Sequence, residues 1–259
     1  MKLTFLGTGA SLGIPMIGCG CEVCQSGDKR DKRLRTSAFI EANGENILID
    51  PGPDFRQQCL THGIDKIDTF LITHPHHDHI GGMDDTRSVF YAMDKKPLQF
   101  YAEQYSIDSI RKYYDYLFPA DGKQVYHGAP QAVFHPLEVG KIFNTAGNTV
   151  LPLRVWHGDM PVTAYKIGRL LYITDAKKIP PETARFIEQD TILILGALHI
   201  RPHHLHFNLD EALAFIEETR PAAAYLTHIS HWMGRHAETE QKLPPRVRLA
   251  YDGLQLEID

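Results

Sequence analysis

The side chains best suited to chemistry lie in a short cluster, His74-x-His76-x-Asp78-His79. Imidazole and carboxylate groups are ligands that suit zinc, manganese and iron. The cluster directly follows the apolar stretch 68–73, which we expect to form a buried strand. A loop at the end of a strand is held by the sheet, so it can bring several ligands to one point. The cluster therefore favours a catalytic metal site over a solvated histidine-rich loop.

Three further residues of the same types follow apolar stretches that we expect to be buried strands. His157 follows residues 151–156, Asp175 follows residues 170–174, and His228 follows residues 223–227. Taken singly, each could be a hydrogen-bonded strand-end residue. Taken with the histidine cluster, they indicate one metal site along one edge of the fold.

Asp50 also ends a predicted strand, and two interpretations of it are equally compatible with the sequence. Its carboxylate could support the histidine loop by hydrogen bonding without touching a metal. It could instead cap the helix expected over residues 54–61.

A second cluster, Cys19-x-Cys21-x2-Cys24, places three thiols on one glycine-containing turn. Three thiolates favour a structural zinc, which requires a fourth nitrogen or sulfur ligand. A disulfide would leave one thiol over, and reduced free thiols are the other alternative. Cys59 lies in a predicted helix and is expected in the core, so His231 is the better candidate for the fourth ligand.

Composition excludes several classes of protein. The 259 residues suffice for one large domain, which we expect to span residues 1–259. The formal net charge of −5 gives no broad attraction to nucleic acid or anionic membranes. No apolar run approaches the ~20 residues of a membrane span, and the N-terminus does not have the form of a signal peptide. We therefore expect a cytoplasmic protein.

Strands and helices alternate along the chain, without repeats or a linker. Strands are expected at residues 2–6, 37–41, 46–50, 68–73, 98–101, 132–135, 151–156, 164–167, 170–174, 191–195, 223–227, 248–251 and 254–258. Helices are expected at residues 54–61, 84–93, 106–117 and 208–218, the last opened by a capping box from Asn208 to Glu211. Asn43-Gly44 and Asp252-Gly253 are typical of hairpin turns.

The histidine cluster resembles the HxHxDH signature of the metallo-β-lactamase superfamily. With the other residues described above, the resemblance extends from Gly7 to Gly253. It implies an α/β fold of four layers, an αβ/βα sandwich in which two mixed sheets pack together with helices outside. It also implies two divalent metal ions, manganese or zinc, with iron or nickel as alternatives.

The same resemblance implies a ligand set for each metal ion. One ion would be held by His74, His76 and His157, and the other by Asp78, His79 and His228. Asp175 would bridge both. Asp78 would in addition orient the attacking hydroxide.

The cysteine turn, joined to the segment from Leu226 to His231, narrows the resemblance to the PhnP-type phosphodiesterases of phosphonate catabolism. That group implies a structural zinc. Its ligands would be Cys19, Cys21, Cys24 and His231. The group also implies that His206 assists the leaving group or stabilises the phosphate. Spacing alone does not separate His206 from the other residues of its segment that could take this role: His199, Arg201, His203 and His204. We expect His203 and His204 to lie in a solvated loop.

These observations predict a metal-dependent hydrolase that cleaves a small, cyclic phosphodiester through hydroxide held by the two metals. Nucleic acid and membranes are not expected partners, and the sequence leaves a homodimer open. Three rival functions are a tRNA 3′-processing nuclease, a PqqB-like protein of quinone-cofactor biosynthesis, and a catalytically silent metal sensor. Residues 84–130 contain no recognisable motif. Four aromatic residues of this segment lie at helical spacing, and such residues are more often part of the core than of a pocket: Tyr113, Tyr114, Tyr116 and Phe118.

Overall fold

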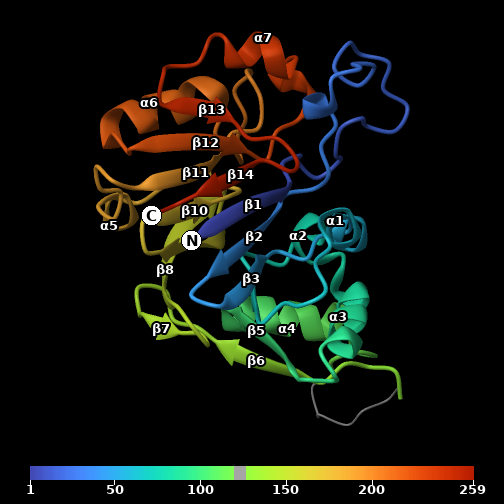
Figure 1. Cartoon of the computed structure of the whole chain (residues 1–259). Coiled ribbons are helices and arrows are strands. Elements are labelled where there is room, and N and C mark those ends of the chain that lie inside the picture. The colour runs from blue at the N-terminus through green and yellow to red at the C-terminus, as the bar shows by residue number, and fades with distance from the viewer. Residues whose placement is uncertain (120–126) are drawn as a thin grey trace.

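The computed structural model describes residues 1–119 and 127–259, and the strands in these residues form two seven-stranded mixed sheets (Figure 1). The first sheet has the order β14 (Gln255–Glu257), β1 (Lys2–Gly7), β2 (Ser37–Ala42), β3 (Glu45–Ile49), β4 (Thr69–Leu71), β5 (Leu98–Ala102), β6 (Ala132–Pro136). The second has the order β13 (Val247–Leu249), β12 (Ala223–Thr227), β11 (Ile192–Gly196), β10 (Leu170–Ile173), β9 (Met160–Ile167), β8 (Thr149–His157), β7 (Phe143–Asn144).

The two sheets have the same mixed pattern. From β14 to β3 and from β7 to β10 the neighbours pair antiparallel. From β3 to β6 and from β10 to β13 they pair parallel. Parallel neighbours deliver their carboxyl ends to one edge of a sheet. Strand-end residues of β4, β10 and β12 can therefore meet where the two sheets face each other.

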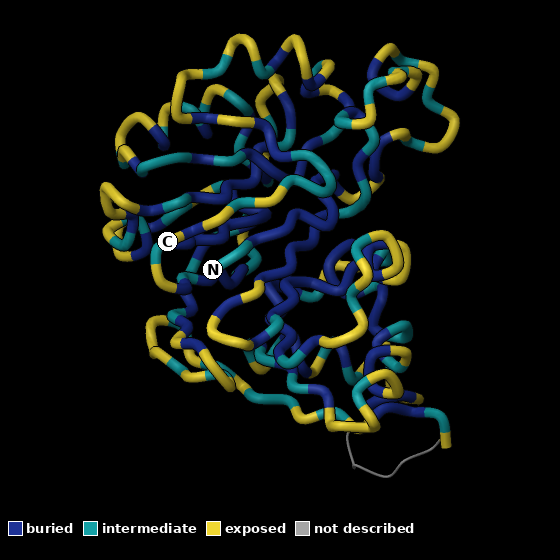
Figure 2. The backbone as a smooth tube through the Cα atoms, in the orientation of Figure 1, coloured by how far each residue is buried: buried dark blue, intermediate teal, exposed yellow. Residues whose placement is uncertain are grey.

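One apolar core fills the space between the sheets. It includes Ile47 and Leu71 from the first sheet and Tyr165, Tyr172 and Ile194 from the second. All five side chains are almost fully buried, and the central strands form the buried interior of the molecule (Figure 2). Because these strands also bury their outer faces, they appear in the sequence as continuous apolar runs.

Helices cover both outer faces. α1 (Phe55–His62), α3 (Thr86–Ala92) and α4 (Gln104–Tyr113) pack on the first sheet, and α6 (Leu209–Thr219) packs on the second. Three short helices lie near strand ends: α2 (His77–Ile80), α5 (Pro181–Ala184) and α7 (His236–Glu240). The result is the predicted four-layer αβ/βα sandwich, which is thereby confirmed.

Local signals in the sequence agree with this fold at two places. Asn43 and Gly44 both have positive φ, 50° and 75°, and turn β2 into its antiparallel partner β3. Asn208 accepts a hydrogen bond from the amide of Glu211, whose carboxylate accepts one from the amide of Asn208. This capping box begins α6 as predicted.

The hairpin predicted around Asp252-Gly253 is wrong. β13 pairs parallel to β12 in the second sheet, whereas β14 pairs with β1 in the first. The turn therefore carries the chain from one sheet to the other. Asp252 accepts hydrogen bonds from the Thr8 hydroxyl and the Leu34 amide, 2.7 and 2.6 Å away, and so holds the turn against the loop after β1.

The aromatic residues of the segment 84–130 divide between core and surface. Phe118 is buried in the outer core of the first sheet and Tyr114 packs against it, as expected. Tyr113 and Tyr116 are instead exposed. Residues 120–126 of this segment lie outside the described residues. In the described parts of the chain, no helix is both long and apolar enough to cross a membrane.

Candidate metal centre

The strand-end residues singled out in the sequence converge on one buried point. The loop after β4 continues into α2 and carries the histidine cluster, while β8, β10 and β12 each bring one residue. Ligand-type atoms lie within 4.8 Å of one another in three overlapping groups: Asp78, His79, Asp175 and His228; His74, His76 and Asp175; His157, Asp175 and His206.

Asp175 is the residue common to all three groups, and it is almost fully buried. Its Oδ1 lies 3.3 Å from His79 Nε2 and 3.3 Å from His228 Nε2, while its Oδ2 lies 3.9 Å from His74 Nε2. Each oxygen thus faces a different set of imidazoles. Such an arrangement would allow one carboxylate to contact two cations.

Asp50 supports the histidine loop from beneath. It is fully buried and accepts hydrogen bonds from His79 Nδ1 at 2.7 Å and from the Thr73 amide and hydroxyl at 2.8 and 2.7 Å. The Thr73 oxygen lies 3.0 Å from His74 Nδ1 and can accept from it. Both rings then present Nε2 to the site with its lone pair free. The supporting interpretation of Asp50 therefore holds. The helix-cap interpretation does not, because the residue preceding α1 is Asp54.

His157 is oriented in the same way from the other sheet. It is the last residue of β8, and its Nδ1 donates to the carbonyl of Leu205 at 2.9 Å. Its Nε2 is left for the site. The acceptor belongs to the loop that also carries His206, so this bond ties two sides of the centre together.

We expect Asp50→Asn to weaken metal binding about 10–100-fold, because losing a residue that orients ligands costs that much in other metal sites. Titration of the metal-free protein with Mn²⁺ measures the change. Asp54→Asn is the matched control, since Asp54 pairs with Arg35 at 3.0 Å. Equal affinities in the wild type and Asp50→Asn would remove Asp50 from the support of the site.

Unusual backbone conformations gather at the strand ends that form the centre. Asp50, Asp175 and His228 have φ values of 59°, 20° and 55°, which non-glycine residues adopt at an energetic cost. Gly52 lies so near the histidine loop that an added Cβ would stand 2.3 Å from the carbonyl oxygen of Asp78. The loop can thus be held tightly only because residue 52 is glycine.

The electrostatics of the centre favour positive charge. Burial opposes the charge on His79, yet the carboxylates of Asp175, Asp78 and Asp50 raise its pKa well above the ordinary value. Burial likewise acts against ionised Asp175, but the charges on His228 and His79 hold its pKa well below the ordinary value. Buried carboxylates therefore gather positive charge at this point, which divalent cations can supply in place of protons.

The donor atoms present fit a pair of divalent cations. Two buried ring nitrogens, His79 Nε2 and His228 Nδ1, have no hydrogen-bond partner in the described structure. The first of them faces the carboxylates of Asp78 and Asp175 at 3.4 and 3.3 Å. Buried polar atoms are rarely left unpaired without a ligand or water nearby, and nitrogen and carboxylate donors suit zinc and manganese.

His206 lies in the wall of the centre. Its Nδ1 is 3.9 Å from Asp175 Oδ2, and its ring centroid lies 4.3 Å from that of His157 and 5.0 Å from that of His228. Burial lowers the pKa of His206 to about 3, although Asp175 acts in the opposite direction. The ring is therefore neutral unless a bound anion stabilises its charge. This position is compatible with proton transfer and also with metal binding.

The loop before His206 differs in part from expectation. His204 is exposed, as predicted, but His203 is half-buried and its ring centroid lies 5.3 Å from that of His206. His203 thus lies in a loop, as expected, but one side of its ring faces His206 rather than solvent. Sequence reasoning left His199 as one of several candidates and missed Trp232, whose ring lies 5.7 Å from that of His199 beside the centre. The signal for Trp232 was its closeness in sequence to His231.

The three cysteines of the turn converge on the segment after β12. The Sγ atoms of Cys19 and Cys21 lie 3.4 and 3.3 Å from His231 Nδ1, and Cys24 completes a group within 4.8 Å. Tetrahedral zinc with bond lengths of ~2.0–2.3 Å places its ligand atoms roughly 3.5 Å apart. Hydrogen bonds from the Cys24 amide and from His231 lower the pKa of Cys21 to about 6, which favours a thiolate. The four residues thus fit a closed zinc site.

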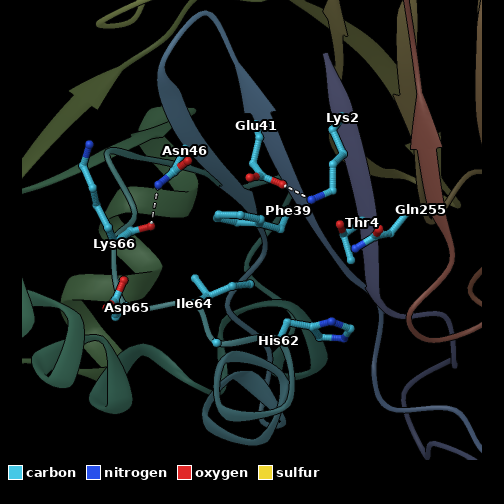
Figure 3. A pocket seen from close by; sticks show the side chains of 11 residues that line it. Lys2, Thr4, Phe39, Glu41, Asn46, His62, Ile64, Asp65, Lys66 and Gln255 are labelled. Atoms are coloured by element: carbon cyan, nitrogen blue, oxygen red, sulfur yellow. Dashed lines mark hydrogen bonds and ion pairs between the residues drawn. The ribbon is translucent and has the colours of Figure 1, made fainter.

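A separate pocket lies at the outer face of β1–β3 (Figure 3). No candidate metal ligand lines it. Both of its lysines are paired, Lys2 with Glu41 of the lining at 2.6 Å and Lys66 with neighbouring Asp68 at 3.2 Å. We therefore place no chemistry there.

Comparison with known proteins agrees with this architecture. The profile of the beta-lactamase superfamily domain matches residues 45–229, which include every residue of the three histidine and aspartate groups. The chain belongs to the metallo-β-lactamase superfamily. This superfamily of hydrolases has the fold described above, and the fold implies divalent metal binding. The profile confirms the membership of the superfamily predicted from the sequence, and the first structure described next confirms the resemblance to the PhnP family.

Three relatives show where the chain lies within the superfamily. The crystal structure of a diphosphatase from the PhnP family superposes with a TM-score of 0.91 and 35% identity, covering 100% of this chain and 98% of that one. Zinc-bound PqqB from Methylobacterium extorquens shares the fold, with a TM-score of 0.79 and 18% identity over 99% of this chain and 100% of that one. A protein of Porphyromonas gingivalis named octanoyltransferase is 40% identical over 100% of this chain, but the match covers 52% of its own length. The chain spans about half the length, or less, of the curated relatives it matches.

Proposed function

We propose that this protein is a phosphodiesterase that hydrolyses a small, cyclic phosphodiester with the help of two divalent cations. The observation that supports this proposal most strongly is the convergence of six ligand-type residues on buried Asp175, with His206 beside it. The six are His74, His76, Asp78, His79, His157 and His228. Phosphoryl chemistry is supported by the similarity to a diphosphatase of the PhnP family.

The residues divide into three roles. We propose that His74, His76 and His157 hold one cation, that Asp78, His79 and His228 hold the other, and that Asp175 bridges them. When bound, the pair of cations, manganese or zinc, supplies Lewis acidity that lowers the pKa of water and neutralises phosphoryl oxygens.

The chain itself positions the reaction. Asp78 Oδ2 lies 3.4 Å from both His79 Nε2 and His228 Nε2, so its carboxylate can orient a nucleophile beside the bridging Asp175. His206 lies at the rim beside Asp175, where it can donate a proton to the departing oxygen. Buried surroundings strengthen both interactions.

Two other reactions are suggested by the names of relatives. Cleavage of a diphosphate linkage is favoured by the PhnP-family diphosphatase and would use the same cations and the same leaving-group assistance. The name octanoyltransferase belongs to a protein about twice as long, so its activity can reside outside the matched half. Acyl transfer is therefore not the function that this site supports.

We expect His206→Ala to retain both cations but to lose turnover by ~10²–10⁴-fold, the usual cost of removing a general acid. The defect should shrink for p-nitrophenyl esters, because p-nitrophenolate leaves without much help from a proton. Metal analysis of the variant measures the retained cations. Turnover of one ester with a p-nitrophenolate leaving group and one with an alcohol leaving group measures the defect in rate. Loss of metal from His206→Ala would identify the residue as a ligand instead, a role that its distance to Asp175 allows.

A substrate panel tests the proposed reaction. Protein loaded with manganese or zinc is assayed on bis(p-nitrophenyl) phosphate, a cyclic nucleotide, a dinucleotide with a diphosphate linkage, a precursor tRNA and an octanoyl thioester. We expect turnover of the diesters, with preference for the cyclic one. Turnover of only the diphosphate, the tRNA or the thioester would overturn the phosphodiesterase assignment.

A further inference from the structure

We propose that a pocket beside the metal centre binds a flat, uncharged heteroaromatic ring of the substrate, with Trp232 as the stacking surface. The proposal rests on the phosphodiesterase function proposed above and deepens it by defining which part of the substrate the protein recognises. The observations that carry it are the composition of the pocket, the exposed indole, and an unpaired nitrogen in the pocket wall.

The pocket has a volume of about 270 Å³ and opens next to the reacting centre. Three segments form it: the loop after β1, the loop after β11 and the segment after β12. Its lining residues are Ala10, Ser11, Leu12, Gly13, Leu198, His199, His203, His206, Ser230, His231 and Trp232. His206 belongs both to this wall and to the metal centre. A substrate whose phosphoryl group lies at the metals can therefore extend into the pocket.

The pocket lining contains no lysine, arginine, aspartate or glutamate. The metal centre, in contrast, contains the carboxylates of Asp78 and Asp175. The two regions suit different parts of one molecule. The charged phosphoryl group fits the metal centre, and an uncharged organic group fits the pocket, where no buried charge would be left unpaired.

Trp232 gives the pocket an aromatic surface that the fold does not use. Its side chain is 54% exposed although it lies next to buried residues. One ring face stacks on His231, with centroids 4.8 Å apart, and its contact with His199 is edge-to-face at 5.7 Å. An exposed indole fixed in this way can stack with a flat ring. Leu12, 68% exposed, lines the same pocket and can close over the ring.

His199 adds a polar contact in the pocket wall. It is only 4% exposed, and its Nδ1 has no hydrogen-bond partner in the described structure. Burial also lowers the pKa of His199, so the ring is neutral. The His199 ring lines the pocket, so a turn of this side chain would bring the unpaired nitrogen to a hydrogen-bonding group on the ligand. This favours a heteroaromatic ring with polar atoms at its edge over a plain hydrocarbon ring.

Two substrates with the same leaving group test the proposal. Thymidine 5′-(p-nitrophenyl phosphate) carries a heteroaromatic base, and methyl p-nitrophenyl phosphate does not. We expect Trp232→Leu to raise KM for the thymidine ester about tenfold, the effect of losing one stacking contact, and to leave the methyl ester within twofold. Leu12→Ala should also raise KM for the thymidine ester. Tyr113→Leu, which removes an exposed aromatic ring from α4, should change neither.

A binding measurement separates this proposal from the proposed reaction. Calorimetry should show that Trp232→Leu weakens binding of thymidine 5′-monophosphate about tenfold and leaves binding of inorganic phosphate unchanged. Zinc content is determined alongside, because Trp232 adjoins His231. If the wild type turns over neither ester, the substrate panel described above tests the phosphodiesterase function, and the calorimetry tests the pocket by itself. If Trp232→Leu binds thymidine 5′-monophosphate as tightly as the wild type, or loses affinity equally for thymidine 5′-monophosphate and phosphate, the proposed binding of a ring in this pocket is wrong.

Discussion

Replacement of Asp175 by asparagine should remove at least one active-site cation and lower turnover by ~10²-fold or more. Asparagine keeps the size of the side chain but removes the negative charge on which three groups of imidazoles converge. Two cations a few Å apart repel each other, and a bridging carboxylate offsets that repulsion. Metal analysis of the purified variant, together with rates on bis(p-nitrophenyl) phosphate, measures both effects.

Asp159→Asn is the matched control for this variant. Asp159 is an exposed carboxylate two residues beyond His157, so its loss changes the net charge near the site without changing the centre. The control should keep its metals and its rate. An Asp175→Asn variant with wild-type metal content and turnover would remove Asp175 from the site.

Replacement of Cys21 by serine should lower zinc content by one equivalent and lower the melting temperature by on the order of 10 °C. A structural zinc contributes its binding free energy to folding, and ~1 kcal/mol shifts the melting temperature of a domain this large by ~2–4 °C. The zinc site would fix the long loop after β1 to the segment carrying His228 and His231. Turnover per folded molecule should fall only modestly.

Cys59→Ala is the control, because Cys59 is a buried core residue of α1 rather than part of the cysteine group. It should lower stability through lost packing while the zinc content stays unchanged. Full zinc content and an unchanged melting temperature in Cys21→Ser would contradict the structural zinc. A folded Cys21→Ser protein without any turnover would instead assign the cysteines to the chemistry.

The sequence indicated the elements of the fold more reliably than the partners of those elements. Each predicted strand has a counterpart, because the central strands bury both faces and are continuous apolar runs. The apolar run 223–227, for example, is β12 without a change of boundary. The short strand β7 and the helices α2, α5 and α7 were not predicted, since two to five residues carry too little periodic pattern.

The failures concern contacts that form only in the folded chain. The turn at Asp252 has the composition of a hairpin, but its flanking strands join different sheets, and periodicity does not specify a partner. Asp50 could not be assigned from sequence because both interpretations require the same residue at a strand end. The structure decides between them through the 2.7 Å contact with His79. Trp232 and His199 become neighbours only when the loops after β11 and β12 meet.

The proposed phosphodiester hydrolysis depends on two cations held by the histidine and aspartate groups. Stepwise reconstitution with Mn²⁺ tests this dependence, with the metals in the protein counted while turnover of a cyclic phosphodiester is followed. We expect no turnover with only the cysteine-bound zinc present. Activity should rise as two further ions bind, to a total of three ions per chain. Full turnover with zinc alone at the cysteines, or no turnover of any phosphodiester with all three ions bound, would contradict the proposed function.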